Sequence, residues 1–263
     1  EKRLLYDKLF ADKVSEPQEQ RDESPANLSA TPSRACTERG VNLASNTNRK
    51  GAKTQSSCQR PEIKAYQYNM TGHVEQCVER YLELAKTTRA KLKKADTPCI
   101  DDHQLAPEDF TNKGALSDVA ARIVLKCLFV ARMQRPDCLW TVNALAREVT
   151  RWNVACDKRL LRLISYMDHT KDWVQVCFVG DLPDKCKLVL FCDASFAGDL
   201  RDSKSTSGSF LALVGPNTFV PLSWMCKKQG AVSHSSSESE IISLDTGVRM
   251  EGIPALTLWD QVI

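Results

Sequence analysis

The segment that begins at Lys187 constrains the fold most. Residues 188–191 are apolar and have the length of a strand buried on both faces, and this run ends on the carboxylate of Asp193. Two further strand-like runs, separated by a Gly-Pro-Asn turn, cover residues 209–214 and 218–226. A helical pattern follows and carries Glu238 and Glu240 near its start. The sequence therefore predicts an α/β (α+β) fold in which three antiparallel strands precede a helix.

Four motifs in this segment carry a resemblance to a known family. They read FCDASFAGD from Phe191, SKSTSG from Ser203, LSWMCKKQ from Leu222 and SSSESE from Ser235. In this order they resemble the ribonuclease H of copia-type LTR retrotransposons. The resemblance implies a partial ribonuclease H-like fold, whose intact form hydrolyses the RNA strand of an RNA–DNA hybrid.

A ribonuclease H uses two Mg²⁺ ions, which prefer carboxylate ligands. The resemblance assigns the catalytic and metal-binding roles to Asp193 and Glu240, because the family's helix glutamate occupies the second of the two glutamate positions. Ser235 and Glu238 fit a capping box, which leaves Glu238 as a helix cap. Glu240 lies one turn further along and is expected to share a sheet-facing side of the helix with Leu244 and Gly247.

Polar residues at the strand ends are candidates for contact with nucleic acid. They could bind the substrate backbone or its phosphates, and they could equally be ordinary turn and strand-end polar residues. The set comprises Ser205, Thr206, Ser207, Lys227, Lys228 and Gln229.

The family's third and fourth acids lie beyond the helix, and the sequence ends at Ile263. The resemblance therefore implies a truncated domain with weak or absent Mg²⁺ binding, in which the strand ending at Asp193 keeps an open edge. The competing hypothesis is a catalytically inactive nucleic-acid-binding protein or a decayed transposon remnant.

The rest of the chain divides into two predicted parts. Residues 1–60 are predicted to be a mostly disordered arm, because residues 16–60 are polar and nearly free of apolar runs, whereas residues 4–14 could form one short amphipathic helix. Residues 61–180 resemble the helical segment that follows the palm of a copia-type reverse transcriptase, and residues 181–263 are the N-terminal half of the ribonuclease H-like domain. Within residues 61–180, helices are expected at 73–94, 118–133, from Pro136 onward and at 157–169, and short strands near 63–70 and 174–178.

Composition indicates more about the cellular compartment of the protein than about its function. The formal charge of +3 does not by itself indicate nucleic acid, and the eleven cysteines are scattered without a Cys-x-x-Cys pair. We expect a reducing, intracellular compartment and no membrane partner, since no long apolar run is present. The expected partners are an RNA–DNA hybrid or other nucleic acid and the rest of the Pol polyprotein.

Three further patterns have simpler explanations. Asp101-Asp102 imitates a polymerase signature, but no apolar strand precedes it, which favours a linker. Asp245-Thr246-Gly247 imitates an aspartic protease motif but fits the helical spacing better. Basic residues at one helix could follow phosphates, although a solvated helix face explains them too: Arg151, Lys158, Arg159 and Arg162.

Overall fold

The computed structural model describes residues 62–198 and 202–262, so the predicted arm at residues 1–60 lies outside the described part. The described chain is a mixed α/β protein with one five-stranded antiparallel sheet, whose order is β1-β2-β5-β4-β3. The strands are β1 Lys64–Tyr68, β2 Gln175–Val179, β3 Lys187–Ser195, β4 Thr206–Gly215 and β5 Thr218–Lys228. The sheet thus contains strands from both sides of the boundary predicted at residue 180.

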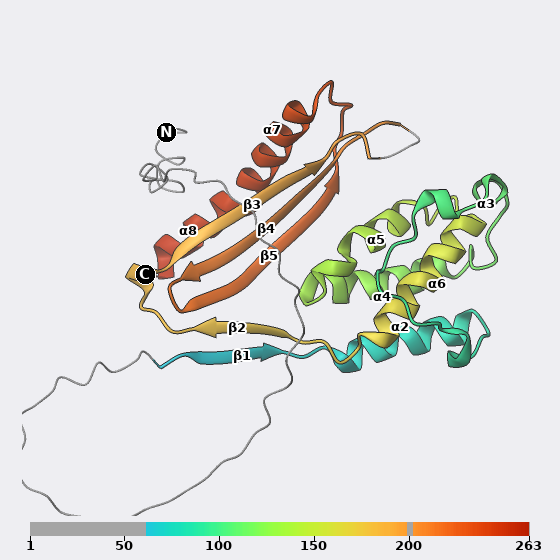
Figure 1. Ribbon diagram of the computed structural model, residues 1–263, viewed down its shortest axis with the longest axis horizontal. Helices are drawn as coiled ribbons and strands as arrows, with labels where there is room; N and C mark the ends of the chain where they lie inside the picture. Colours follow the sequence, from blue (N-terminus) through green and yellow to red (C-terminus); the bar gives the residue numbers. More distant parts are fainter. Residues whose placement is uncertain (1–61, 199–201, 263) are drawn as a thin grey trace, which may run out of the picture. The chain divides into compact units, whose positions relative to one another are not determined.

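Helices between β1 and β2 form a group with its own apolar core (Figure 1). They are α2 Thr71–Leu84, α3 Pro107–Thr111, α4 Ala120–Met133, α5 Pro136–Arg147 and α6 Val154–His169. The 3.6-residue spacing of apolar side chains explains the core, because it places one face of each long helix inward. Ile123, Val142 and Leu163 are fully buried representatives from α4, α5 and α6.

The first of these helices ends earlier than its sequence predicts. Apolar spacing favoured a helix as far as residue 94, but α2 stops at Leu84. Lys86 adopts a left-handed conformation with φ of 49°, and the backbone N–H of Thr87 bonds to the carbonyl of Leu82. This is a Schellman termination, formed here without the glycine that usually signals it.

Three consecutive antiparallel strands, β3, β4 and β5, are followed by helix α7 (Ser236–Gly247), a π-helical turn (Val248–Gly252) and helix α8 (Ile253–Val262). Figure 1 shows α7 and α8 following the length of β3. The predicted Gly-Pro-Asn turn joins β4 to β5 through the pair Gly215 and Thr218. The order of strands and helix is that predicted from the sequence.

The strand β3 differs from expectation in one respect. It is an edge strand of the described sheet, and Phe191 is 54% exposed, so the prediction of burial on both faces is wrong. Leu188 and Leu190 are buried, whereas the alternate residues face away from α7. The strand is therefore covered by a helix on one face only.

Candidate functional site

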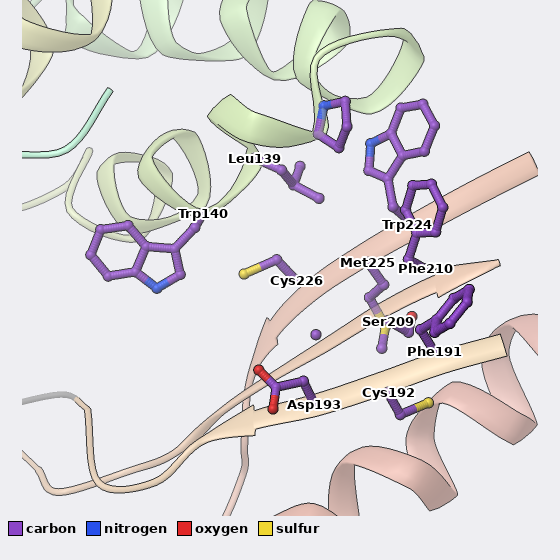
Figure 2. Close-up of a pocket in the computed structure, with 12 residues that line it drawn as sticks. Leu139, Trp140, Phe191, Cys192, Asp193, Ser209, Phe210, Trp224, Met225 and Cys226 are labelled. Atoms are coloured by element: carbon purple, nitrogen blue, oxygen red, sulfur yellow. The ribbon is translucent and has the colours of Figure 1, made fainter. Parts of the chain in front are cut away.

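Asp193 lies near the end of β3 and its side chain is exposed. The carboxylate points into a cavity of about 300 Å³ between the sheet and α5, whereas neighbouring Cys192 points towards α7 (Figure 2). Among the described residues, none hydrogen-bonds to or forms an ion pair with this carboxylate. Its oxygens are therefore available to a ligand.

The start of α7 uses Glu238 as a cap, which confirms the prediction. The Ser235 side-chain oxygen accepts a hydrogen bond from the Glu238 backbone N–H at 3.1 Å. The Glu238 carboxylate in turn accepts the backbone N–H of His234 at 2.7 Å. This reciprocal pair satisfies two backbone donors at the helix start.

Glu240 is exposed and lies beside Cys192 at the end of β3. Burial raises the pKa of the Cys192 thiol, and the negative charge of Glu240 raises it further. Asp193 follows Cys192 in the strand, so the two candidate acids lie near the same end of β3, and the Asp193 side chain points to the face of the sheet away from α7. No described residue forms a hydrogen bond or an ion pair with the Glu240 carboxylate either.

The face of α7 that packs on the sheet is formed by small residues. Ser239, Ser243 and Gly247 are buried, whereas Leu244 is 38% exposed. The expectation that Leu244 shares the sheet-facing side is therefore wrong. A four-residue repeat of small side chains lets the helix backbone approach β3 closely, and a larger side chain such as Leu244 is left outside.

The described acids supply a limited ligand set for Mg²⁺. No group of three or more Asp, Glu, His or Cys side chains with metal-binding geometry occurs within residues 62–198 and 202–262. Asp193 and Glu240 are thus two accessible carboxylates without a third ligand grouped with them in the described chain, and a hydrated Mg²⁺ commonly keeps several waters and binds through one or two carboxylates and a substrate phosphate.

Half of the candidate nucleic-acid residues are engaged inside the protein. Gln229 is buried, and its amide nitrogen donates to Ser207 Oγ at 3.0 Å and to the Ser239 carbonyl at 2.9 Å. Its amide oxygen accepts from Ser233 Oγ at 3.0 Å. Ser205 is also buried, and its hydroxyl accepts the Ala197 N–H. These contacts favour the interpretation of Ser205, Ser207 and Gln229 as polar residues that stabilise the turn and strand ends, and not as nucleic-acid ligands.

The remaining members of that set are more accessible. Lys227 is exposed, and Thr206 is half-buried near the end of the β4–β5 ladder. Lys228 forms an ion pair with Asp202 at 2.7 Å. Lys227 and Thr206 thus lie where a ligand at the strand ends could reach them.

The basic residues of α6 pair with the protein itself. Lys158 and Arg159 form ion pairs with Asp109 and Asp102, and Arg162 donates to the Thr97 carbonyl at 2.9 Å. These contacts hold the linker before α4 against α6. Asp102 is therefore explained by its ion pair with Arg159, which agrees with the prediction of a linker at this polymerase-like motif.

Two other sequence patterns are explained by local structure. Arg151 pairs with Glu148 at 3.2 Å, which accounts for the fourth basic residue near α6. The Asp245-Thr246-Gly247 triplet lies within α7, as its helical spacing predicted.

A row of aromatic side chains beside Asp193 was not identified from the sequence. Phe191, Phe210 and Trp224 are cross-strand neighbours on β3, β4 and β5 and line the cavity together with Trp140 of α5. The sequence contained one indication of this row: side chains alternate between the two faces of a strand, so Phe191 and Asp193, two residues apart, share a face. The register that joins the three strands was needed to find the row.

Comparisons with known proteins found relatives that are similar to part of the chain. No protein-family model matches the chain, and no solved structure matches it. The Retrovirus-related Pol polyprotein from transposon RE2 of Arabidopsis thaliana is 28% identical over 166 residues, which is 61% of this chain and 10% of that protein. The Pol polyprotein from transposon RE1 of the same plant is 29% identical over 175 residues, 66% of this chain and 11% of that protein.

The chain is similar to a fragment of these retrotransposon Pol polyproteins, as a copia-type Pol fragment would be. It spans about a tenth of the length of the two Pol polyproteins. The Secreted RxLR effector protein 161 of Plasmopara viticola is also similar, with 30% identity over 123 residues, 44% of this chain and 78% of that protein. Within residues 62–198 and 202–262, every helix is too short or too polar to span a membrane.

Proposed function

We propose that β3, β4, β5 and α7 form a ribonuclease H-like unit of the Pol chain that binds an RNA–DNA hybrid. The observation that carries this proposal is the position of two unpaired carboxylates, Asp193 and Glu240, at the same end of β3. The strand order supports it, since three consecutive antiparallel strands precede the helix that carries Glu240. Similarity to the Pol polyproteins of transposons supports it as well.

Asp193 and Glu240 would hold Mg²⁺ at this end of the sheet. A magnesium ion bound there supplies charge that attracts a phosphate and lowers the pKa of a bound water. The protein's own contribution is positional. Ser243 and the small-residue face of α7 fix the helix against β3, and the Glu238 cap leaves Glu240 free to face the ligand.

The alternative function is nucleic-acid binding without cleavage. It is favoured by the ligand count, because the described residues bring together fewer than three candidate metal ligands. A two-metal mechanism uses more carboxylates than Asp193 and Glu240 alone provide. Binding to a hybrid through one hydrated ion does not need the additional acids.

Hybrid binding and hybrid cleavage, measured separately with the full chain, test both functions. A fluorescently labelled RNA–DNA hybrid is titrated with protein in Mg²⁺ and in EDTA, and its RNA strand is then analysed for cleavage. The variants are Asp193→Asn and Glu240→Gln. The matched control is Asp245→Asn, which changes an exposed carboxylate elsewhere on α7 that pairs with Arg249.

We expect Mg²⁺-dependent hybrid binding that Asp193→Asn and Glu240→Gln weaken and Asp245→Asn preserves. Cleavage that disappears in the same two variants supports the ribonuclease H-type activity. Binding with no cleavage supports the inactive alternative. If Mg²⁺ changes neither binding nor cleavage, or if the control variant behaves like the other two, the proposal fails.

A further inference from the structure

The cavity that Asp193 lines has features of a binding site for more than a metal ion. It lies between α5 and the face of β3, β4 and β5 that points away from α7 (Figure 2). Its volume of about 300 Å³ is at the lower end of the range for small-molecule pockets, roughly 300–1,000 Å³. A cavity of this size suits one planar group and excludes a duplex.

The floor of the cavity is set by two rows of cross-strand neighbours. Phe191, Phe210 and Trp224 form the aromatic row, in which the Phe210 and Trp224 rings stack with 6.2 Å between centroids and 15° between planes. Asp193, Gly208 and Cys226 form the next row. Gly208 contributes no side chain, so the floor beside the carboxylate stays open.

The wall and the floor are joined by hydrogen bonds that hold the cavity open. Trp224 Nε1 donates to the Ala131 carbonyl at 2.9 Å, and Asn143 Nδ2 of α5 donates to the Cys226 carbonyl at 2.9 Å. Both contacts fix β5 to the helical group. The floor of the cavity is therefore held in place against the helices without a ligand.

Two aromatic side chains at the cavity are left partly open to solvent. Trp140 is 46% exposed and Phe191 is 54% exposed, and the other residues that line the cavity are mostly apolar. Among the described residues that line the cavity, Asp193 is the one that carries a charge. Open ring faces next to an acceptor-only carboxylate match a planar aromatic ligand with N–H donors on its edge.

We propose that this cavity binds a single unpaired nucleobase, stacked against Trp140 or Phe191 with an N–H edge directed to Asp193. The proposal rests on the proposed nucleic-acid function and adds a ligand class and two binding residues to it. Without Mg²⁺ the negatively charged Asp193 carboxylate repels phosphate, so the base enters the cavity and the backbone stays outside. Base–aromatic stacking tolerates any sequence, because every base has a π face.

Binding of short single-stranded RNA to the full chain in EDTA tests this inference without any metal-dependent step. Fluorescence anisotropy compares a labelled oligonucleotide with the same oligonucleotide made abasic and with a fully paired duplex. The variants are Trp140→Ala and Phe191→Ala. Phe129→Ala is the matched control, since Phe129 is 51% exposed on α4 and does not line the cavity.

We expect the single strand to bind more tightly than the abasic strand and the duplex. Trp140→Ala or Phe191→Ala, whichever removes the ring that stacks on the base, should weaken its binding by about 5- to 150-fold, the range for loss of one base–aromatic stack. Phe129→Ala should bind normally. Equal affinity for the abasic strand, or normal affinity in both cavity variants, would overturn the inference, and far-UV circular dichroism confirms that each variant is folded.

The results also separate this inference from the proposed function. If Asp193→Asn and Glu240→Gln abolish Mg²⁺-dependent hybrid binding while both Trp140→Ala and Phe191→Ala have no effect in EDTA, the acid pair is supported and the base site is not. If Trp140→Ala weakens single-strand binding while Mg²⁺ has no effect on hybrid binding, the base site stands and the acid pair fails.

Discussion

Ser243 on α7 donates a hydrogen bond to the backbone carbonyl of Asp193, with 2.6 Å between the two oxygens. The same hydroxyl lies 3.3 Å from the Gly208 carbonyl on β4. One side chain thus connects the helix that carries Glu240 to the residue that carries the other candidate ligand. The relative position of the two acids depends on how closely α7 packs on β3.

Gly247 tests this close packing. A Cβ added there would lie 2.5 Å from the Cys192 sulfur. We expect Gly247→Ala to lower the free energy of unfolding by about 1–3 kcal/mol, because an extra carbon forces the helix or Cys192 to move. Urea denaturation measures the change.

Two companion variants identify the cause of that loss. Gly72→Ala on α2 meets no atom within 4 Å and should be neutral or stabilising by up to about 1 kcal/mol. Cys192→Ala should reduce the cost of Gly247→Ala when the two are combined. Additive effects in the double variant would contradict the predicted contact.

The corner between α4 and α5 is held by a buried guanidinium. Arg135 is 3% exposed and bonds to both oxygens of the Asp137 carboxylate and to the backbone carbonyl and hydroxyl of Thr170. The guanidinium also lies 5.4 Å from the ring centres of Tyr166 and Trp173. Removal of this side chain leaves the Asp137 charge without its partner, and we expect Arg135→Ala to cost about 3–5 kcal/mol in urea denaturation.

The same corner should make stability depend on pH. Burial raises the pKa of Asp137, but the hydrogen bonds and positive charge of Arg135, with the Tyr166 hydroxyl, outweigh burial and hold it below its usual value. Because the native pKa lies below the unfolded one, the stabilisation is complete above the unfolded pKa, about 3.9, and is lost as pH falls through the native pKa. Asp137→Asn should therefore destabilise the protein at pH 7 and lose less stability than wild type on acidification. Parallel stability curves for the two proteins between pH 6 and pH 2 would contradict this assignment.

The buried side-chain amide of Gln229, at the end of β5, should contribute more to the stability of the protein than to nucleic-acid binding. Gln229→Ala removes the contacts to Ser207, Ser233 and the Ser239 carbonyl, so we expect a loss of about 1–3 kcal/mol in the free energy of unfolding. Lys227→Ala, at the exposed neighbouring position, should change stability by less than about 0.5 kcal/mol. If Lys227 contacts phosphate, its variant should instead lower the salt dependence of hybrid binding.

Local sequence patterns predicted where the helices and strands lie better than they predicted which side of each element is buried and which elements contact each other. Spacing of apolar residues located α4 and α6, and the Ser235–Glu238 pair located the start of α7. Lys86 shows why the end of α2 was missed, since a left-handed lysine gives no sequence signal comparable to glycine.

The contacts between elements had no local signal. The side of α7 that faces β3 was misjudged at Leu244, because hydrophobicity normally marks the buried side and here close backbone approach requires serine and glycine. The aromatic row at the cavity depends on the register of β3, β4 and β5, which a single strand's sequence does not contain.

The two glutamates of α7 should separate stability from ligand binding. Glu238→Ala removes the acceptor for the His234 N–H and a favourable charge at the helix start, which should cost about 0.5–1 kcal/mol. Glu240→Ala removes an exposed carboxylate with no protein partner among the described residues, so stability should change by less than about 0.5 kcal/mol. Urea denaturation without Mg²⁺ measures both effects, and calorimetric titration with Mg²⁺ should show weaker binding in Glu240→Ala alone. Each residue's role follows from whether its carboxylate is already bonded to the backbone, as that of Glu238 is. A stability loss in Glu240→Ala together with weaker Mg²⁺ binding in Glu238→Ala would therefore reverse the two assignments.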